Sequence, residues 1–173
     1  QWNDPDVQRL IEVSSEHQRS MAWASTFLQK GYRLGLMASS DGHMGHPGYG
    51  ALFPGQFNAA QIGEGLVAVL APENTRAGVF TSLYDRHCYA TTGDRIVLDF
   101  QVNGALMGSD IHASAAPDIK VKVLGTTTLE QVDIVKDVHV IYTVQPNRDS
   151  VDFTWRDPHF VPGSSPYYYL QVK

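Results

Sequence analysis

The chain has 173 residues, of which 43% are hydrophobic and 18% are charged, a balance typical of a globular protein. Its net charge of −5 argues against a nucleic-acid partner, and no apolar run approaches the roughly 18 residues that a membrane span needs. Cys88 is the only cysteine, which excludes an intrachain disulfide and a zinc cage of thiolates. Because the chain begins QWNDPDV, without an initiator Met or a signal-peptide pattern, we expect a fragment of a longer protein.

The first part of the chain predicts one helix and one strand. Whether a further strand precedes them is undecided on the sequence. Residues 20–31 (SMAWASTFLQKG) predict a helix with Ser20 as N-cap and Gly31 as its stop. The run YRLGLMA, residues 32–38, predicts a buried strand. By pattern alone, residues 4–17 (DPDVQRLIEVSSEH) fit either a helix or a short buried strand.

Residues 65–86 predict a further strand and a further helix. GLVAVLA, residues 65–71, is typical of a buried strand, and residues 72–86 are typical of a helix. The apolar residues of this helix that share one face are Ala77, Phe80, Leu83 and Tyr84. Strand–helix–strand–helix order predicts part of a parallel α/β architecture.

From about Cys88 onward the chain shows only short β-type runs. IKVKV, residues 119–123, alternates as a half-buried antiparallel strand should. Turn signals separate the runs, at Asn103-Gly104, Gly125, Lys136-Asp137, Pro146-Asn147 and Pro162-Gly163. Strands at this spacing predict a small sandwich.

The stretch MASSDGHMGHPG, residues 37–48, begins at the end of the predicted strand 32–38 and continues into polar residues. Asp41 and His43 are two residues apart, so in an extended backbone their side chains point the same way. A carboxylate and an imidazole that converge are a natural ligand pair for Mn, Fe or Zn, and the mouth of a parallel barrel collects such groups. The alternative is an Asp-Gly turn with an exposed His43, and the residues alone leave both open.

Three neighbouring residues are weaker candidates. Glu16 and His17 follow the possible first strand and either reach the same mouth or form a solvated loop pair. His46 is either a loop histidine or a contact to substrate or metal.

The remaining titratable residues lack ligand spacing. We interpret Glu73 as a helix-start acid with Arg76 as its partner, and Arg95 as a boundary salt-bridge residue. The other histidines are interpreted as structural, namely His87, His112, His139 and His159. No nucleophile elbow, P-loop, dinucleotide fingerprint or H-E-x-x-H motif occurs. The residues alone therefore predict no complete active site, and at most Asp41 and His43 would form one half of a metal site.

The closing run PYYYLQV places Tyr167 and Tyr169 on one side of a strand and Tyr168 on the other. This pattern fits a strand with one core face and one surface face, or a platform on which a sugar stacks.

Three segments taken together resemble one known family. They are GYRLGLMASSDGHMGHPG (31–48), GLVAVLAPENTRAGVFTSLYDRHCYATTGDRI (65–96) and SSPYYYLQVK (164–173). Together they resemble the C-terminal part of a PHP-like bacterial family, PHP being the polymerase and histidinol phosphatase superfamily of metal-dependent hydrolases. The relative is a large, mostly uncharacterised group in its amidohydrolase-like wing, domain-of-unknown-function family 3604, and the similarity is closest over residues 31–96.

The resemblance implies a distorted β/α barrel whose last strand ends in an Asp-x-His metal-ligand motif, which falls on Asp41 and His43. It also implies that LIEVSSEH, residues 10–17, is the preceding barrel strand. The implied fold class is α/β plus β, with a C-terminal barrel remnant at residues 1–93 and a small antiparallel β-sandwich-like domain at residues 94–173.

The family's His-x-His motif and intermediate His and Glu ligands have no counterpart in this chain. We therefore expect the C-terminal segment of a metal-dependent hydrolase of the phosphoesterase type. Its intact parent would hold divalent Mn, Zn or Fe, whereas this fragment alone would be inactive. Expected partners are the missing N-terminal part and a small-molecule substrate, with self-association through exposed strand edges.

A second function remains open on the sequence. It is a non-catalytic module whose β half binds carbohydrate or protein on an α/β scaffold. The bacterial origin that the resemblance implies is compatible with the cytoplasm and with the periplasm.

Overall fold

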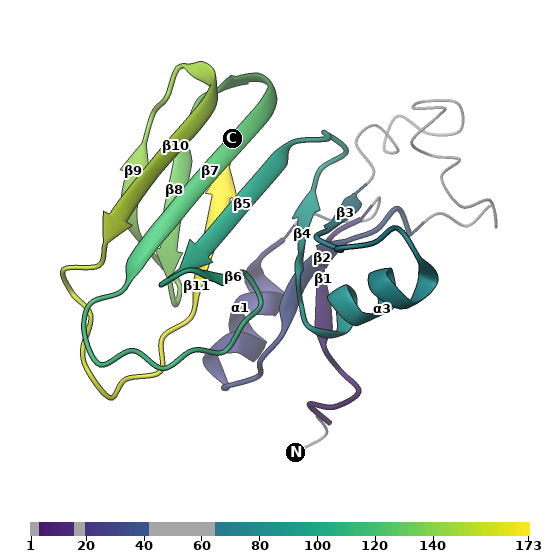
Figure 1. Ribbon diagram of the computed structural model, residues 1–173, viewed down its shortest axis with the longest axis horizontal. Helices are drawn as coiled ribbons and strands as arrows, with labels where there is room; N and C mark the ends of the chain where they lie inside the picture. The colour runs from purple at the N-terminus through teal and green to yellow at the C-terminus, as the bar shows by residue number, and fades with distance from the viewer. Residues whose placement is uncertain (1–3, 16–19, 42–64) are drawn as a thin grey trace. The chain divides into compact units, whose positions relative to one another are not determined.

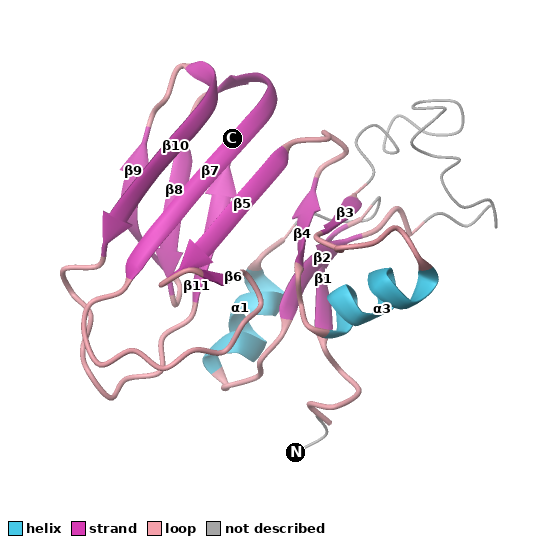
Figure 2. Cartoon of the chain, in the orientation of Figure 1, coloured by secondary structure: helices cyan, strands magenta, loops and turns pink. Residues whose placement is uncertain are grey.

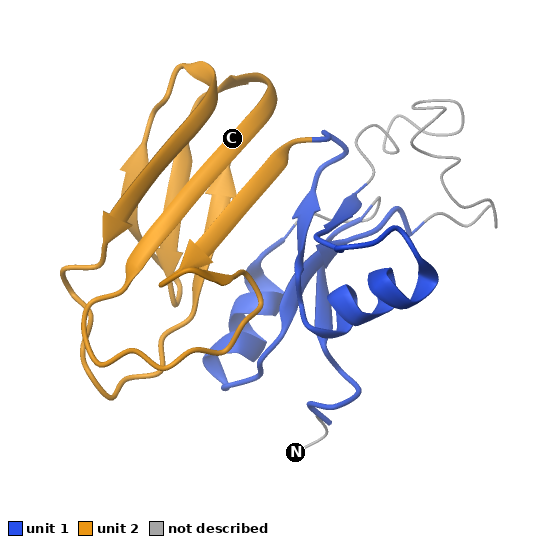
Figure 3. Cartoon of the chain, viewed as in Figure 1, with its two compact units in different colours: residues 1–95 blue, residues 96–173 orange. Residues whose placement is uncertain are grey.

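The computed structural model describes residues 4–15, 20–41 and 65–173. The chain divides into two compact units, residues 1–95 and 96–173, which Figure 3 colours separately. Within the described ranges, no helix has the length and apolar character needed to cross a membrane.

The first unit begins with a parallel strand–helix–strand motif. β1 (Leu10–Ser14) is followed by α1 (Ala22–Gln29) and then by β2 (Gly35–Ala38), as Figure 1 shows. β1 and β2 pair in parallel, with Leu10 opposite Gly35. The strand at residues 10–14 decides between the two conformations that the pattern left open. Its parallel pairing with β2 is the arrangement predicted for this half, but the strands of the described residues form small sheets that do not close into a barrel.

α1 ends where the sequence predicts. Gly31 has a φ of 84°, the left-handed conformation that glycine adopts without strain. Its amide donates to the carbonyl of Leu28, and the amide of Tyr32 donates to that of Phe27, so the last carbonyls are satisfied. The rings of Phe27 and Tyr32 stack at 5.4 Å across this end. The predicted cap Ser20 lies one residue ahead of the structural N-cap, although its hydroxyl accepts from the first helical amide.

The rest of the first unit is antiparallel. β3 (Leu66–Val69) pairs with β4 (Cys88–Thr91), and α3 (Arg76–Tyr84) connects them. β4 lies beside β2, where the Cys88 Sγ is 3.9 Å from the Leu36 carbonyl oxygen. The strand predicted at 65–71 is present but half-buried. The parallel order predicted from the element sequence therefore holds for β1 and β2 and not for β3 and β4.

The predicted packing face of α3 is wrong. Thr75 caps the helix by accepting from the Gly78 amide at 3.0 Å, and Ser82 is its buried residue. Of the predicted face, Ala77, Phe80 and Tyr84 are exposed and Leu83 is half-buried. At Gly78 a Cβ would lie 2.6 Å from the Glu73 carbonyl oxygen, so the turn that leads into α3 leaves no room for a side chain there.

The second unit contains only strands, coloured magenta in Figure 2, which confirms the prediction of an antiparallel β second half. One sheet has the order β10-β7-β5-β6. Its strands are β5 (Val97–Val102), β6 (Ala105–Leu106), β7 (Asp118–Leu129) and β10 (Arg148–Arg156). The other has the order β11-β8-β9. Its strands are β8 (Val132–Lys136), β9 (His139–Val144) and β11 (Tyr168–Val172).

The core of the second unit comes from alternate positions of β7 and from consecutive buried residues of β8. The buried apolar side chains include Ile119, Val121 and Val123 on β7, and Val132 and Ile134 on β8. The ring of Tyr142 on β9 stacks on Trp155 of β10 at 5.0 Å and contacts Phe153 at 5.7 Å, which joins the two sheets. The unit is therefore sandwich-like.

Four of the five predicted turns occur in the structure, each with a backbone in the left-handed region. The residues concerned are Asn103, Gly104, Asp137, Asn147 and Gly163. Gly125 was predicted as a turn and instead lies inside β7. The β7–β10 register breaks there, between Leu124 and Leu129, and a Cβ on Gly125 would lie 2.7 Å from the Thr127 carbonyl oxygen. A glycine in a strand interior thus marks an irregularity and not a chain reversal.

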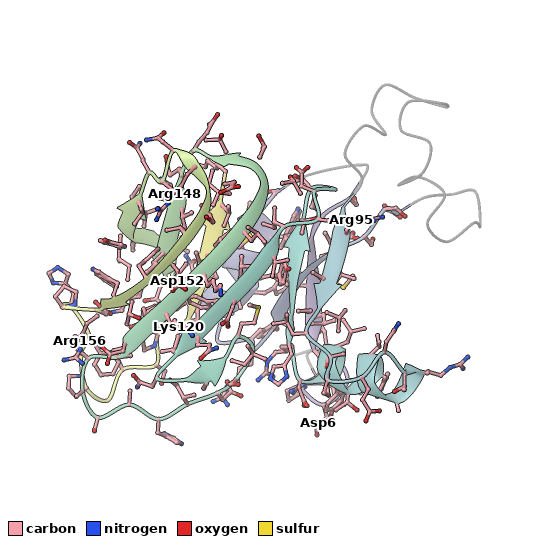
Figure 4. The ribbon with its side chains drawn as sticks, turned by 45° about the horizontal axis from the view of Figure 1, so that its top comes forward. Asp6, Arg95, Lys120, Arg148, Asp152 and Arg156 are labelled. Carbon is pink, nitrogen blue, oxygen red and sulfur yellow. The ribbon has the colours of Figure 1, made fainter. Side chains whose placement is uncertain are left out.

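The outer face of the β10-β7-β5 sheet is charged. Lys122 on β7 lies opposite Asp99 on one neighbouring strand and Asp152 on the other. Figure 4 labels Asp152 and Arg156 along this sheet. The Arg156 guanidinium donates to both carboxylate oxygens of Asp118, at 2.7 and 2.8 Å. Opposite charges paired across strands are typical of a solvated face.

Candidate functional site

The carboxyl ends of β1 and β2 meet at one edge because the two strands run in parallel. Ser14 is the last residue of β1, and Ser15 follows it. Ser39 and Asp41 follow β2. The Ser39 amide donates to the Ser14 carbonyl at 3.1 Å, so the two chain segments remain side by side beyond β2. Asp41 is exposed and has a φ of 52°, in the left-handed region that Asp tolerates better than most residues.

A bulge shapes the end of β1. The register with β2 shifts between Glu12 and Ser14, and the carbonyl of Val13 accepts from the Ser20 amide at 2.9 Å. The Ser39 hydroxyl donates to the Glu12 carboxylate. Bulges of this kind redirect side chains at strand ends. Here the hydrogen bond from Ser39 connects Glu12 of β1 to the segment that carries Asp41.

Gly65 approaches the same edge through its backbone. A Cβ at this position would lie 2.5 Å from the Ser14 carbonyl oxygen and 2.7 Å from both the Ala38 Cβ and the Ser39 carbonyl oxygen. Ser14 is 5% exposed, and its buried hydroxyl has no hydrogen-bond partner among the described residues. The chain therefore returns directly over the two strand ends before β3.

We expect Gly65→Ala to destabilise the first unit, because an added methyl would push the ends of β1 and β2 apart. Overpacking of this kind costs about 1–3 kcal/mol. Urea unfolding of the full chain should show a lower midpoint for Gly65→Ala than for the wild type. An unchanged midpoint would mean that the strand ends can separate without cost.

The predicted site residues fall into two groups. Asp41 lies beyond the end of β2, and its φ of 52° departs from the extended backbone assumed for its alignment with His43. His43, His46, Glu16 and His17 lie outside the described residues. Within the described ranges, no three His, Cys, Asp or Glu side chains gather closely enough to hold a metal ion. The role of Asp41 as a metal ligand and its pairing with His43 therefore stay predictions.

The residues interpreted as structural lie largely at the surface. Glu73, Arg76 and Arg95 are exposed, and the first turn of α3 contains no acidic residue, so Glu73 does not act as its helix-start acid. Of the histidines, His112, His139 and His159 are exposed and His87 is half-buried.

A buried carboxylate network in the second unit had no signal in the sequence. Asp157 is 0% exposed. Its carboxylate accepts from the Lys136 ammonium at 2.7 Å, the Tyr168 hydroxyl at 2.8 Å and the His159 amide at 2.9 Å. Burial opposes ionisation, but these donors and the Lys136 charge outweigh it and hold the pKa of Asp157 below its usual value. Burial and the neighbouring carboxylate raise the pKa of Tyr168.

This network is structural in character. It connects three parts of the chain that are separated in sequence. These are β8, the segment that directly follows β10, and β11. Lys136 also donates to the His159 carbonyl at 3.0 Å. Only long-range packing assembles these groups, so local spacing could not reveal them. Satisfied buried pairs of this kind fix geometry, and we assign the network no catalytic role.

The alternation predicted for the last strand is present. Tyr167 and Tyr169 stack at 6.3 Å on one side, and Tyr168 turns to Asp157 on the other. Both stacked residues are half-buried, and the Tyr167 hydroxyl is buried. This arrangement resembles a packed surface of the sheet more than an open platform for a sugar.

Comparison with known proteins gives relatives without an assigned activity. A family described as "Protein of unknown function (DUF3604)" matches residues 53–122. An uncharacterized protein of Chlamydia pneumoniae is 31% identical over 166 residues, covering 84% of this chain and 25% of the relative. Uncharacterized proteins of Chlamydia trachomatis and Chlamydia muridarum are each 30% identical over 103 residues, covering 56% of this chain and 17% of each relative. No solved structure matches. The chain thus spans at most about a quarter of the length of the curated relatives it matches.

Proposed function

We propose that the chain is the C-terminal segment of a metal-dependent hydrolase of the phosphoesterase type. The observation that carries the proposal is the position of Asp41, just beyond the end of β2 in a parallel β1–α1–β2 motif. Barrel enzymes collect their catalytic and metal-binding groups at the carboxyl ends of their parallel strands. The motif is what one segment of a distorted β/α barrel would contribute.

Asp41 and His43 would supply the final ligand pair of the metal site. The donor set fits a divalent transition metal, because a carboxylate oxygen and an imidazole nitrogen are the ligands that Mn, Fe and Zn share. Glu16, His17 and His46 would lie around the site. Glu12, through the Ser39 hydroxyl, would hold the segment that presents Asp41.

Two ligands do not complete a catalytic site. Such a site needs at least three protein ligands and an open position, so the remaining ligands would come from the rest of a longer protein. When bound, the metal would activate water and polarise the phosphoester. The role of this chain is then to position the last two ligands at the strand ends.

The test compares the full-length protein with residues 1–173. After metal removal by a chelator, the full-length protein should hydrolyse p-nitrophenyl phosphate or bis-p-nitrophenyl phosphate only when Mn or Zn is returned. Residues 1–173 alone should show no turnover above background with either metal, because a metal held by two ligands is bound weakly. Clear turnover by residues 1–173, or turnover by the full-length protein that chelation leaves unchanged, would contradict the proposal.

A further inference from the structure

α3 presents an aromatic face to solvent, which we call the α3 aromatic face and define as Ala77, Phe80 and Tyr84. Phe80 is 67% exposed and Tyr84 is 38% exposed. Their rings stack on each other at 6.2 Å, so they form one continuous apolar surface. Single exposed apolar residues are common, whereas contiguous exposed apolar surface often marks a contact site.

The first described residues of the chain extend this surface. The guanidinium of Arg9 lies 4.7 Å from the centre of the Tyr84 ring and donates to the Tyr84 carbonyl at 2.7 Å. Val7, two residues earlier, is 79% exposed. In Figure 4 the labelled Asp6 lies near α3, in agreement with these contacts. The segment before β1 is therefore held against the C-terminal end of α3.

The charged sheet face of the second unit offers a contrast. There Lys122 lies between Asp99 and Asp152, so the charges compensate one another in water. The side chains of the α3 aromatic face carry no charge, and Arg9 is the charged residue that lies over the Tyr84 ring. Burial of this face against another surface would be favourable.

We propose that the α3 aromatic face packs against the part of the longer polypeptide that lies outside residues 1–173. The curated relative from Chlamydia pneumoniae is matched over 25% of its length, so the remaining three quarters can supply a covering surface. Within the described residues, β1 pairs with a strand on one side only, which leaves an edge for a further strand of the same protein. The inference rests on the proposed function in treating the chain as one segment of a larger enzyme.

Hydroxyl-radical footprinting tests the inference without reading catalysis. Residues 1–173 and the full-length protein are oxidised in parallel, and side-chain labelling is measured by mass spectrometry. Phe80 and Tyr84 should be labelled several-fold more slowly in the full-length protein. Leu124, which is 51% exposed on β7, serves as the reference and should be labelled equally in both.

A variant provides the second measurement. Phe80→Ser should lower the thermal unfolding midpoint of the full-length protein much more than that of residues 1–173, where the ring is exposed and the substitution removes only its stacking on Tyr84. Leu124→Ser is the matched control and should change neither. A merely structural role for Phe80 would lower both midpoints equally.

Three results would overturn the inference. The first is equal labelling of Phe80 in the two proteins. The second is protection of Phe80 in residues 1–173 that grows with protein concentration, which would identify a second copy of the chain as the occupant. The third is concentration-independent protection in residues 1–173 alone, which would place the cover within the chain. Because footprinting needs no turnover, an inactive enzyme with a protected Phe80 would refute the proposed function and leave this inference standing.

Discussion

Replacing Asp41 with alanine in the full-length protein should abolish metal-dependent phosphoester hydrolysis. Removing a group that merely orients a metal ligand already costs about 10–100-fold in metal affinity or activity, so loss of a ligand itself should exceed that range. Without the carboxylate the metal is held too weakly to lower the pKa of its bound water. His43→Ala should have the same effect. The measurement is kcat/KM together with the metal content of the purified protein.

The variants can be chosen so that folding and ligation are separated. Asp41 has a φ of 52°, and asparagine tolerates this conformation, so Asp41→Asn removes the charge with little change in backbone strain. Asp94→Ala removes an exposed carboxylate elsewhere in the first unit and should leave the activity and the metal content unchanged. Full activity or undiminished metal content in Asp41→Asn would refute the assignment of Asp41 as a ligand.

Asp157→Ala should strongly destabilise the second unit. The substitution leaves the Lys136 ammonium and the Tyr168 hydroxyl without their carboxylate partner in a largely buried position. Breaking a buried ion pair by removing one partner costs about 3–5 kcal/mol. Urea unfolding followed by fluorescence of Trp155, which lies on β10, should show this loss.

Two further variants isolate the network as the cause. Lys136→Met combined with Asp157→Ala should cost less than the sum of the two single substitutions, because the double variant leaves no unpaired charge. Asp118→Ala breaks the ion pair with Arg156, whose side chain is 67% exposed, and should leave the midpoint nearly unchanged. Additive effects of Lys136→Met and Asp157→Ala would show that the pair does not act as a unit.

The same network makes stability depend on acid pH. The pKa of Asp157 is lowered in the folded state from an ordinary value of 3.8, because its hydrogen bonds and the Lys136 charge outweigh burial. The stabilisation is therefore fully present above that ordinary value and is lost as the pH falls through the folded value. Between about pH 5 and about pH 2, the wild type should lose more stability than Asp157→Asn.

Local patterns determined most of the secondary structure. The alternation of IKVKV fixed which residues of β7 face the core, since successive strand residues point to opposite faces. Asn103-Gly104 formed the predicted turn, which joins β5 to β6, because both residues accept a positive φ. Gly31 ended α1 for the same reason. These features depend on a few adjacent residues, so the sequence suffices to predict them. The position of Asp41 after a buried strand also followed from local order.

Only the tertiary structure decided which faces are buried and which distant groups meet. The apolar face of α3 is exposed because the helix packs through Ser82, and spacing identifies an apolar face without identifying what covers it. Gly125 belongs to an irregular strand because pairing between β7 and β10 overrides its preference for turns. Gly65 is required by a backbone approach to strand ends more than twenty residues away, and Asp157 meets Lys136 across the second unit. Such contacts arise from the folded arrangement of the whole chain, and no window of neighbouring residues contains them.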